Sequence, residues 1–129
     1  MSLVAPCGVR WIPLVIAVLA CQKERSLSSA AEITDRSWRA HVLVIAAGER
    51  TKTCAEAGVA MQQVFTSHRQ AFVDAMTLDR DKAKLAEATA FIEANEDRYA
   101  DIDSRMGALA ERCTDDATVQ AVFQQMSGP

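Results

Sequence analysis

The sequence predicts an all-α fold, a small antiparallel bundle of three main helices followed by a short C-terminal helix. Alanine is abundant, whereas glycine and proline are scarce between residues 25 and 127, and this composition favours helix. Apolar residues recur at spacings of three and four along most of the chain. Capping residues stand where these patterns begin, twice with a glutamate three positions later. Brief polar stretches separate the patterns, so neighbouring helices should run in opposite directions.

The first helix is expected over residues 30–47. Ser29 can accept a hydrogen bond from a free backbone N–H of the first turn, and Glu32 can reach back to the serine amide. Gly48 is expected to end the helix in a left-handed conformation. The apolar positions form a stripe broad enough to contact two neighbouring elements: Ile33, Trp38, Val42, Val44 and Ile45.

A strand is the alternative for residues 42–45. A β-rich run before two alanines and Gly48 could lead into a phosphate-binding loop. No second strand pattern is available to pair with it, and a single glycine is not a glycine-rich fingerprint. We therefore expect a helix here.

The second helix is expected from Cys54 to about Met76, because Thr53 and Glu56 form another capping pair. A polar turn over residues 79–82 then separates it from the third helix. The core side of the second helix is spaced by threes and fours: Cys54, Ala57, Met61, Val64, Phe65, His68, Phe72 and Ala75.

The third helix repeats an apolar residue at every seventh position: Leu85, Ile92, Tyr99, Met106 and Cys113. Asn95 falls on the same side, which indicates a local polar contact or a bend near residues 95–97. The short last helix is expected to open with Thr114 as its capping residue. Because a helix of about 12 residues is marginal alone, it must lie on the others through one apolar face: Val119, Val122, Phe123 and Met126.

The N-terminal stretch has the layout of an export signal. Arg10 precedes an apolar run that ends in the small residue Ala20. This run is too short for a membrane-spanning helix, which needs about 20 apolar residues. Its last residues resemble the lipobox of bacterial lipoproteins: Val18, Leu19, Ala20 and Cys21. The resemblance implies that residues 1–20 are removed as a signal peptide and that Cys21 is lipidated.

The resemblance also implies where the protein lies. Residues 21–28 are expected to be a lipidated tether, and residues 29–129 a helical-bundle domain. Seven extended residues span at most about 25 Å, so the domain should sit close to the membrane surface. Gln22 after the lipidated cysteine implies the periplasmic side of the outer membrane or the cell surface. An ordinary secretory signal and an uncleaved anchor are the alternatives.

The four cysteines of the chain divide by position. Cys7 leaves with the signal peptide and Cys21 carries the lipid, which leaves Cys54 and Cys113 in an oxidising compartment. The start of the second helix and the end of the third meet in an antiparallel hairpin. We expect one disulfide between them, with the third helix starting late or bending to bring Cys113 into place. Two buried free thiols are the alternative.

The sequence offers little sign of chemistry, and we expect neither enzymatic activity nor a cofactor. The 17 acidic residues face 13 basic ones once Arg10 is removed, a formal charge of −4, and the basic residues are scattered, which argues against nucleic acid as a partner. His41 and His68 could hold a metal or haem with Met61 or Met106, but no paired-histidine, Glu-x-x-His or haem-attachment motif is present. Three carboxylates at four-residue spacing are more typical of a solvated face than of a cation site: Glu93, Asp97 and Asp101.

Two hypotheses about function remain. The first is a non-catalytic cell-envelope lipoprotein, held at the membrane surface as a structural module or to engage another envelope protein. The alternative is a small-ligand or metal carrier with a site between helices near Trp38, His41 and His68. A carrier needs a polar-lined cavity between helices, whereas an interaction module needs a solid core and an exposed apolar patch.

Overall fold

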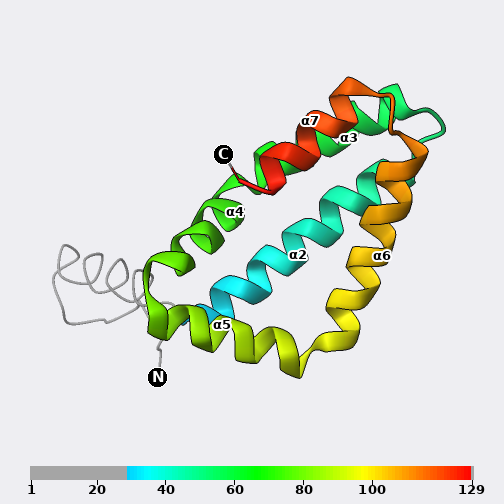
Figure 1. Ribbon diagram of the computed structural model, residues 1–129. Helices are drawn as coiled ribbons and strands as arrows, with labels where there is room; N and C mark the ends of the chain where they lie inside the picture. The colour runs from blue at the N-terminus through cyan, green and yellow to red at the C-terminus, as the bar shows by residue number, and fades with distance from the viewer. Residues whose placement is uncertain (1–28, 129) are drawn as a thin grey trace, which may run out of the picture.

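A computed structural model describes residues 29–128, which are almost entirely helical and contain no strand. Residues 1–28, with the predicted signal peptide, Cys21 and the tether, lie outside the described residues. The elements, shown in Figure 1, are α2 (Ala30–Glu49), α3 (Cys54–Ser67), α4 (Arg69–Met76), the 3-10 helix η1 (Thr77–Arg80), α5 (Lys82–Ala94), α6 (Glu96–Arg112) and α7 (Ala117–Met126). The all-α prediction is confirmed, and residues 42–45 are helical.

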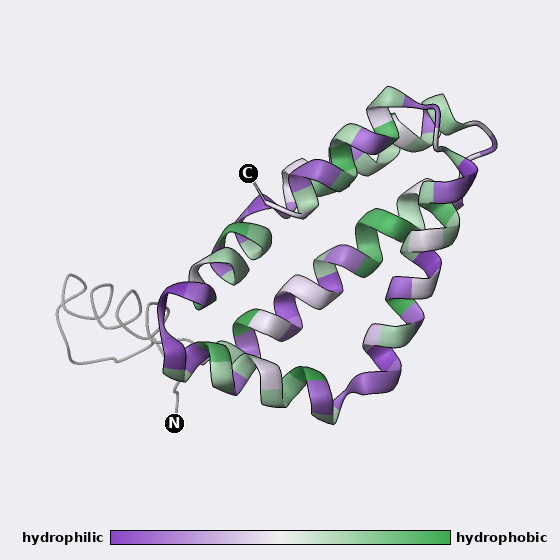
Figure 2. Cartoon of the chain, in the orientation of Figure 1, coloured by the Kyte–Doolittle hydropathy of each residue, from purple (hydrophilic) through white to green (hydrophobic). Residues whose placement is uncertain are grey.

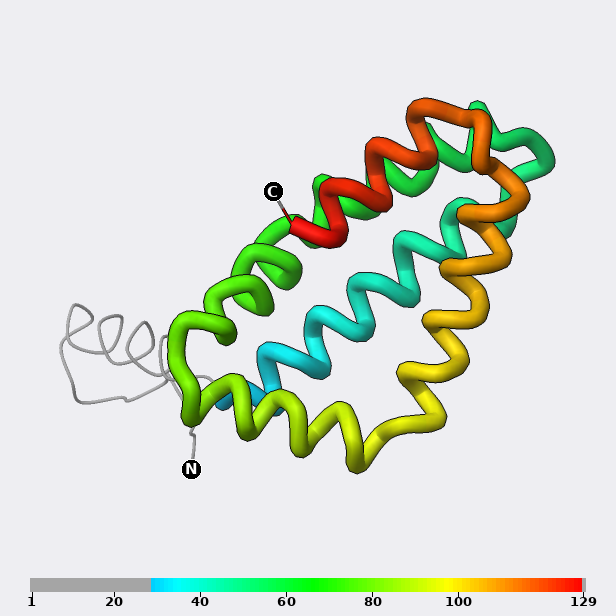
Figure 3. The backbone as a smooth tube through the Cα atoms, viewed as in Figure 1, coloured from blue at the N-terminus to red at the C-terminus, as the bar shows by residue number. Residues whose placement is uncertain are grey.

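Helix α2 is the centre of the arrangement. It contacts α3, α4, α5 and α6, while α7 packs on α3. The tube in Figure 3 shows α3, α4 and α7 along one side of α2, and α5 and α6 along the other. Figure 2 shows the hydrophobic residues of α2 gathered in the half that leads to α3, with hydrophilic residues more frequent in the other half. The main core therefore lies toward the α3 end of α2, and the surroundings of its first half are more polar.

The expected count of three helices plus a short fourth is wrong, because the second and third predicted helices are each divided. The first division lies at His68, whose backbone (φ −114°, ψ 17°) departs from helical geometry. His68 is exposed, so its expected place on the core side is also wrong. A residue at a helix break no longer follows the 3.6-residue period of the helix before it, and its side chain is free to point to solvent.

The second division lies at Asn95 (φ −124°, ψ 35°), where α5 ends and α6 begins. Its side-chain amide donates a hydrogen bond of 2.8 Å to the carbonyl oxygen of Phe91, one of the carbonyls left free at the end of α5. The polar contact and the bend expected near this residue thus occur together. The bend changes the direction of the chain before it reaches Cys113.

Gly48 lies inside α2 rather than ending it, so the expected left-handed conformation is wrong. A Cβ atom at this position would lie 2.7 Å from Sδ of Met61 and 2.8 Å from Cδ2 of Leu109. The glycine is therefore explained by close approach of side chains from α3 and α6. In the described part of the chain, the only glycine with a positive φ is Gly128.

Two of the three expected helix caps are confirmed. Ser29 accepts from the Glu32 amide at 3.1 Å, and Thr53 accepts from the Glu56 amide at 3.1 Å, each with the reciprocal bond from the glutamate. The third cap is wrong, because Asp116 and not Thr114 accepts from the first turn of α7. The hydroxyl of Thr114 instead donates to carbonyl oxygens at the end of α6.

The predicted disulfide joins Cys54 at the start of α3 to Cys113 just after α6, with the two Cα atoms 5.5 Å apart. Cys113 is 2% exposed and belongs to the main core. This core brings together α2, α3, α4, α6 and α7 through residues that include Val44, Ile45, Met61, Phe65, Phe72, Ile102, Leu109, Val119 and Val122. The disulfide therefore lies at the α3 end of α2, the end toward which the main core is placed.

Candidate functional site: a cavity between α2, α5 and α6

A cavity of about 310 Å³ lies between the first half of α2 and the bent pair α5 and α6. Four of the five heptad residues expected to form a packed seam line this cavity instead: Leu85, Ile92, Tyr99 and Met106. Leu85 and Ile92 remain 42% and 39% exposed. The bend at Asn95 explains the difference, because two helices that diverge from a straight line cannot both press the same seam against α2. The volume of the cavity falls at the lower end of the range for small-molecule sites.

Tyr99, one of the residues that line the cavity, carries a polar group without a partner. The hydroxyl oxygen of Tyr99 is buried and makes no hydrogen bond within the described residues. Burial raises the pKa of this hydroxyl above its ordinary value, so it stays protonated and able to donate. A buried polar group without a partner costs about 1–3 kcal/mol. Such a group is rare in a folded protein and calls for a physical explanation.

His41 supplies the second polar group of the cavity. Its Nδ1 lies 2.7 Å from the carbonyl oxygen of Ser37 and must donate to it, because a carbonyl can only accept. Burial lowers the pKa of His41, so the imidazole is neutral near pH 7 and Nε2 carries a lone pair. The ring also packs on Phe72, with ring centroids 4.7 Å apart. His41 is thus a fixed hydrogen-bond acceptor at the cavity wall.

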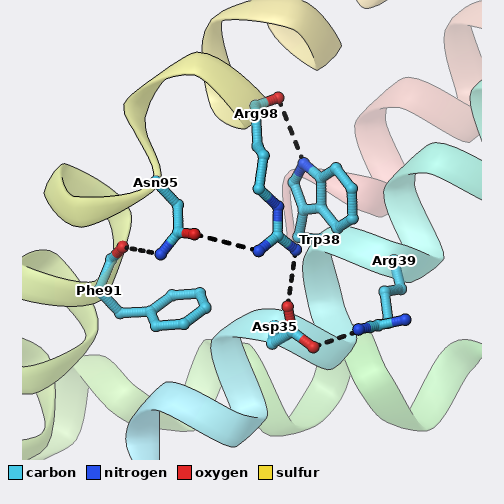
Figure 4. A network of polar contacts seen from close by, with 6 residues as sticks. All are labelled: Asp35, Trp38, Arg39, Phe91, Asn95 and Arg98. Atoms are coloured by element: carbon cyan, nitrogen blue, oxygen red, sulfur yellow. Dashed lines mark hydrogen bonds and ion pairs between the residues drawn. The ribbon is translucent and has the colours of Figure 1, made fainter.

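A polar network holds the bend that shapes the cavity (Figure 4). The guanidinium of Arg98 lies 3.9 Å from the centre of the Trp38 ring and donates to Asp35 at 2.7 Å and to Asn95 at 3.1 Å. The indole N–H of Trp38 donates back to the carbonyl oxygen of Arg98 at 3.3 Å. Asp35 also accepts from Arg39 at 2.8 Å. The start of α6 is therefore bound to α2 at the mouth of the cavity.

This network predicts a pH-dependent stability. Hydrogen bonds from Arg39 and Arg98 hold the pKa of Asp35 below its ordinary value. A depressed folded-state pKa stabilises the fold above the unfolded-state value, about 3.9, and this stabilisation is lost as pH falls through the folded-state value. Asp35→Asn should therefore lower the free energy of unfolding at pH 7, and the gap to wild type should narrow at pH 3. Urea unfolding at the two pH values measures the difference in free energy of unfolding between the variant and wild type. A difference of equal size at both pH values would contradict the role of Asp35.

The structure brings together only part of the site expected from the sequence. Trp38 and His41 line the cavity, whereas His68 is exposed at the break between α3 and α4 and does not line it. Within residues 29–128 no group of three histidine, cysteine, aspartate or glutamate side chains is placed to hold a metal ion. The heptad pattern predicts Tyr99 in the apolar seam but indicates no functional role for it. In the sequence, only its position in the seven-residue repeat distinguishes Tyr99.

A second hollow lies on the other side of the molecule, between α4 and α7. This groove of about 650 Å³ is lined by residues that include Phe65, Arg69, Phe72, Val73 and Met76. Val73 and Met76 are 38% and 37% exposed. In the described residues this side has no buried polar group without a partner, in contrast to the cavity.

Comparison with known proteins does not indicate a function, so the proposal rests on the geometry of the site. No protein-family model matches the chain, and searches against curated proteins and solved structures give no match. Among residues 29–128, none of the helices combines the length and the hydropathy needed to cross a bilayer.

Proposed function

We propose that this protein is a non-catalytic, membrane-tethered binding protein of the cell envelope that holds a small ligand between α2, α5 and α6. The observation that carries the proposal is the buried, unpartnered hydroxyl of Tyr99 at a largely apolar cavity. The cavity is largely apolar and not polar-lined as expected for a carrier, but ligand sites typically combine apolar walls with a few placed polar groups, here Tyr99 and His41. A ligand group that forms a hydrogen bond with the Tyr99 hydroxyl would remove the cost of leaving it unpaired.

The packing of α5 supports a route of entry for such a ligand. Ala88 is the only buried residue of α5, and it belongs to a small cluster with Ala30 and Leu78 apart from the main core. One side-chain bond, from the Ala31 amide to Glu87 at 3.0 Å, joins α5 to the start of α2. Helices with few buried contacts open locally at low free-energy cost. Movement of α5 would therefore open the cavity while the main core and the disulfide stay intact.

Tyr99→Phe tests the proposal through two opposite effects. Removing an unpartnered buried hydroxyl should raise the free energy of unfolding of the ligand-free protein by about 1–3 kcal/mol. The same change should weaken binding of a ligand that forms a hydrogen bond with that hydroxyl. Stability is measured by urea unfolding, and affinity by titration with 2-phenylethanol. Loss of stability in the variant would show that the hydroxyl has a partner, and unchanged affinity would show that it does not contact the ligand.

The tether rests on the lipobox resemblance of Val18 to Cys21, which lies outside the described residues. Lipid-anchored attachment predicts that Cys21→Ala moves the protein from the detergent phase to the aqueous phase. Stable anchoring requires two signals, such as two acyl chains, and the variant would lack them. Detergent phase partitioning after expression in a bacterium measures how the protein distributes between the two phases. Identical partitioning of wild type and variant would contradict lipidation at this residue.

Engagement of another envelope protein is the second candidate function. It is favoured by the apolar groove between α4 and α7, where Val73 and Met76 are exposed, and by Val59 on α3, which is 58% exposed. Apolar groups gathered at a groove are typical of interaction sites. In this case Val73→Glu, at an exposed position, would leave the fold intact and remove cross-links that the wild-type protein forms in whole cells. Cross-links that survive the change would argue against this groove.

A further inference from the structure

The charged side chains at the cavity all carry the same sign. Among residues 29–128, Asp79 from η1 and Asp103 from α6 are the charged residues that line it, and no lysine or arginine of this part of the chain does so. The guanidinium of Arg98 lies over Trp38, a residue of the cavity lining, and is paired with Asp35 and Asn95. Asp35 also pairs with Arg39, so it offsets the charge of Arg98 only in part, and Arg98 does not belong to the lining of the cavity. An anionic ligand would meet two carboxylates with no cation to bind it, whereas a cationic ligand would be attracted.

The polar groups of the cavity are also mostly acceptors. Nε2 of neutral His41 accepts, because Nδ1 already donates to Ser37. The Asp103 carboxylate accepts and lies near enough to His41 for its charge to act on the imidazole. The Tyr99 hydroxyl can accept as well as donate. A group with several N–H donors matches this arrangement better than a carboxylate or phosphate does.

We propose that the ligand of this cavity is a small organic monoamine, with its ammonium toward Asp103, His41 and Tyr99 and its apolar part against Trp38, Leu85 and Ile92. This inference rests on the proposed ligand-binding function and adds the charge and chemical class of the ligand. The apolar part supplies most of the affinity, since the walls are mainly hydrophobic. The ammonium supplies the preference over neutral and anionic molecules of the same shape.

Three probes with the same ring separate shape from charge: 2-phenylethylamine, 2-phenylethanol and 3-phenylpropionate. They are titrated into the full-length chain carrying Trp11→Phe, so that Trp38 at the cavity is the only tryptophan. The pH is kept above the range in which histidine titrates, so His41 remains neutral. We expect the amine to bind about three- to fivefold more tightly than the alcohol, the size of effect usual for a partly solvated charge pair. The carboxylate should bind most weakly.

Two variants on α6 provide the matched comparison. Asp103→Asn removes the charge at the cavity, and Asp101→Asn removes the same charge from a side chain that does not line it and is 69% exposed. Asp103→Asn should reduce the preference for the amine over the alcohol, because only Asp79 then remains as a carboxylate at the cavity, and Asp101→Asn should preserve it.

Each outcome of this experiment decides one of the two claims. Equal affinity for the amine and the alcohol, tighter binding of the carboxylate, or an unchanged preference in Asp103→Asn would overturn the amine inference and leave the ligand-binding function standing. If none of the three probes changes the Trp38 fluorescence, the ligand-binding function itself fails.

Discussion

Replacing both Cys54 and Cys113 by alanine is expected to lower the free energy of unfolding by about 2–5 kcal/mol. The bridge spans a sequence separation of 59 residues, and in the chain-entropy account a closed loop of this size restricts the unfolded chain by about 4 kcal/mol. Cys113 is also buried in the main core, so its replacement removes packing as well as the cross-link. A loss of this size is a large share of the stability of a domain of about 100 residues.

Urea unfolding followed by circular dichroism measures this effect. The double variant should remain helical at low urea, because its helix caps and most of its core are untouched. Wild type treated with a reducing agent is the control, since it loses the cross-link but keeps both sulfur atoms. The disulfide account would be contradicted if the variant and the reduced wild type both unfolded at the same urea concentration as the oxidised protein.

Gly58→Ala is expected to destabilise the protein by about 1–3 kcal/mol, the usual cost of overpacking. A Cβ atom at Gly58 would lie 2.7 Å from Cβ of Thr118 and 3.2 Å from its backbone carbonyl carbon. Rotation of the Thr118 side chain cannot relieve a contact with its Cβ or its backbone. The start of α7 would therefore have to move away from α3, and the Asp116 cap beside it would be disturbed.

Gly107→Ala is the matched control, because both glycines lie inside α-helices. A Cβ at Gly107 meets no atom within 4 Å, so only the helix propensity changes. This variant should stabilise the protein by about 0.5–1 kcal/mol. Thermal unfolding of both variants gives the comparison. Changes in stability of the same sign and size in the two variants would refute close packing of α3 on α7.

The sequence predicts those features of the fold that depend on local chemistry. The capping pairs at Ser29 and Thr53 satisfy free amides through residues three positions apart, so their effect does not depend on the rest of the chain. The disulfide is predicted correctly, but the expected hairpin is not: α3 and α4 lie on one side of α2 and α5 and α6 on the other, and only the start of α3 and the end of α6 meet. The two capping pairs and the disulfide are therefore predicted correctly, although the number of helices is not.

The errors arise where tertiary packing outweighs a local pattern. The apolar period continues through His68, yet the helix breaks there. The sequence does not predict this break, because periodicity does not record where a long helix must bend to follow α2. Gly48 resembles a helix end in the sequence, but its role comes from Met61 and Leu109, which are distant in the chain. A preference of a single residue cannot reveal contacts of this kind.

The candidate site could be anticipated only in part for the same reason. Trp38 and His41 lie on one helix, and their spacing places them together without knowledge of the fold. Tyr99 joins them only because the chain bends at Asn95 and directs α6 back toward α2. The absence of a partner for its hydroxyl depends on the position of every neighbouring atom, which no sequence pattern specifies.

Intermolecular nuclear Overhauser effects between 2-phenylethylamine and the isotopically labelled full-length chain test the central claim most directly. Binding in the cavity predicts cross-peaks from the ring of the probe to Trp38 and Ile92, and from its amine end to Tyr99. Cross-peaks confined to Val73 and Met76 in the groove between α4 and α7, or no cross-peaks at all, would contradict a ligand site between α2, α5 and α6.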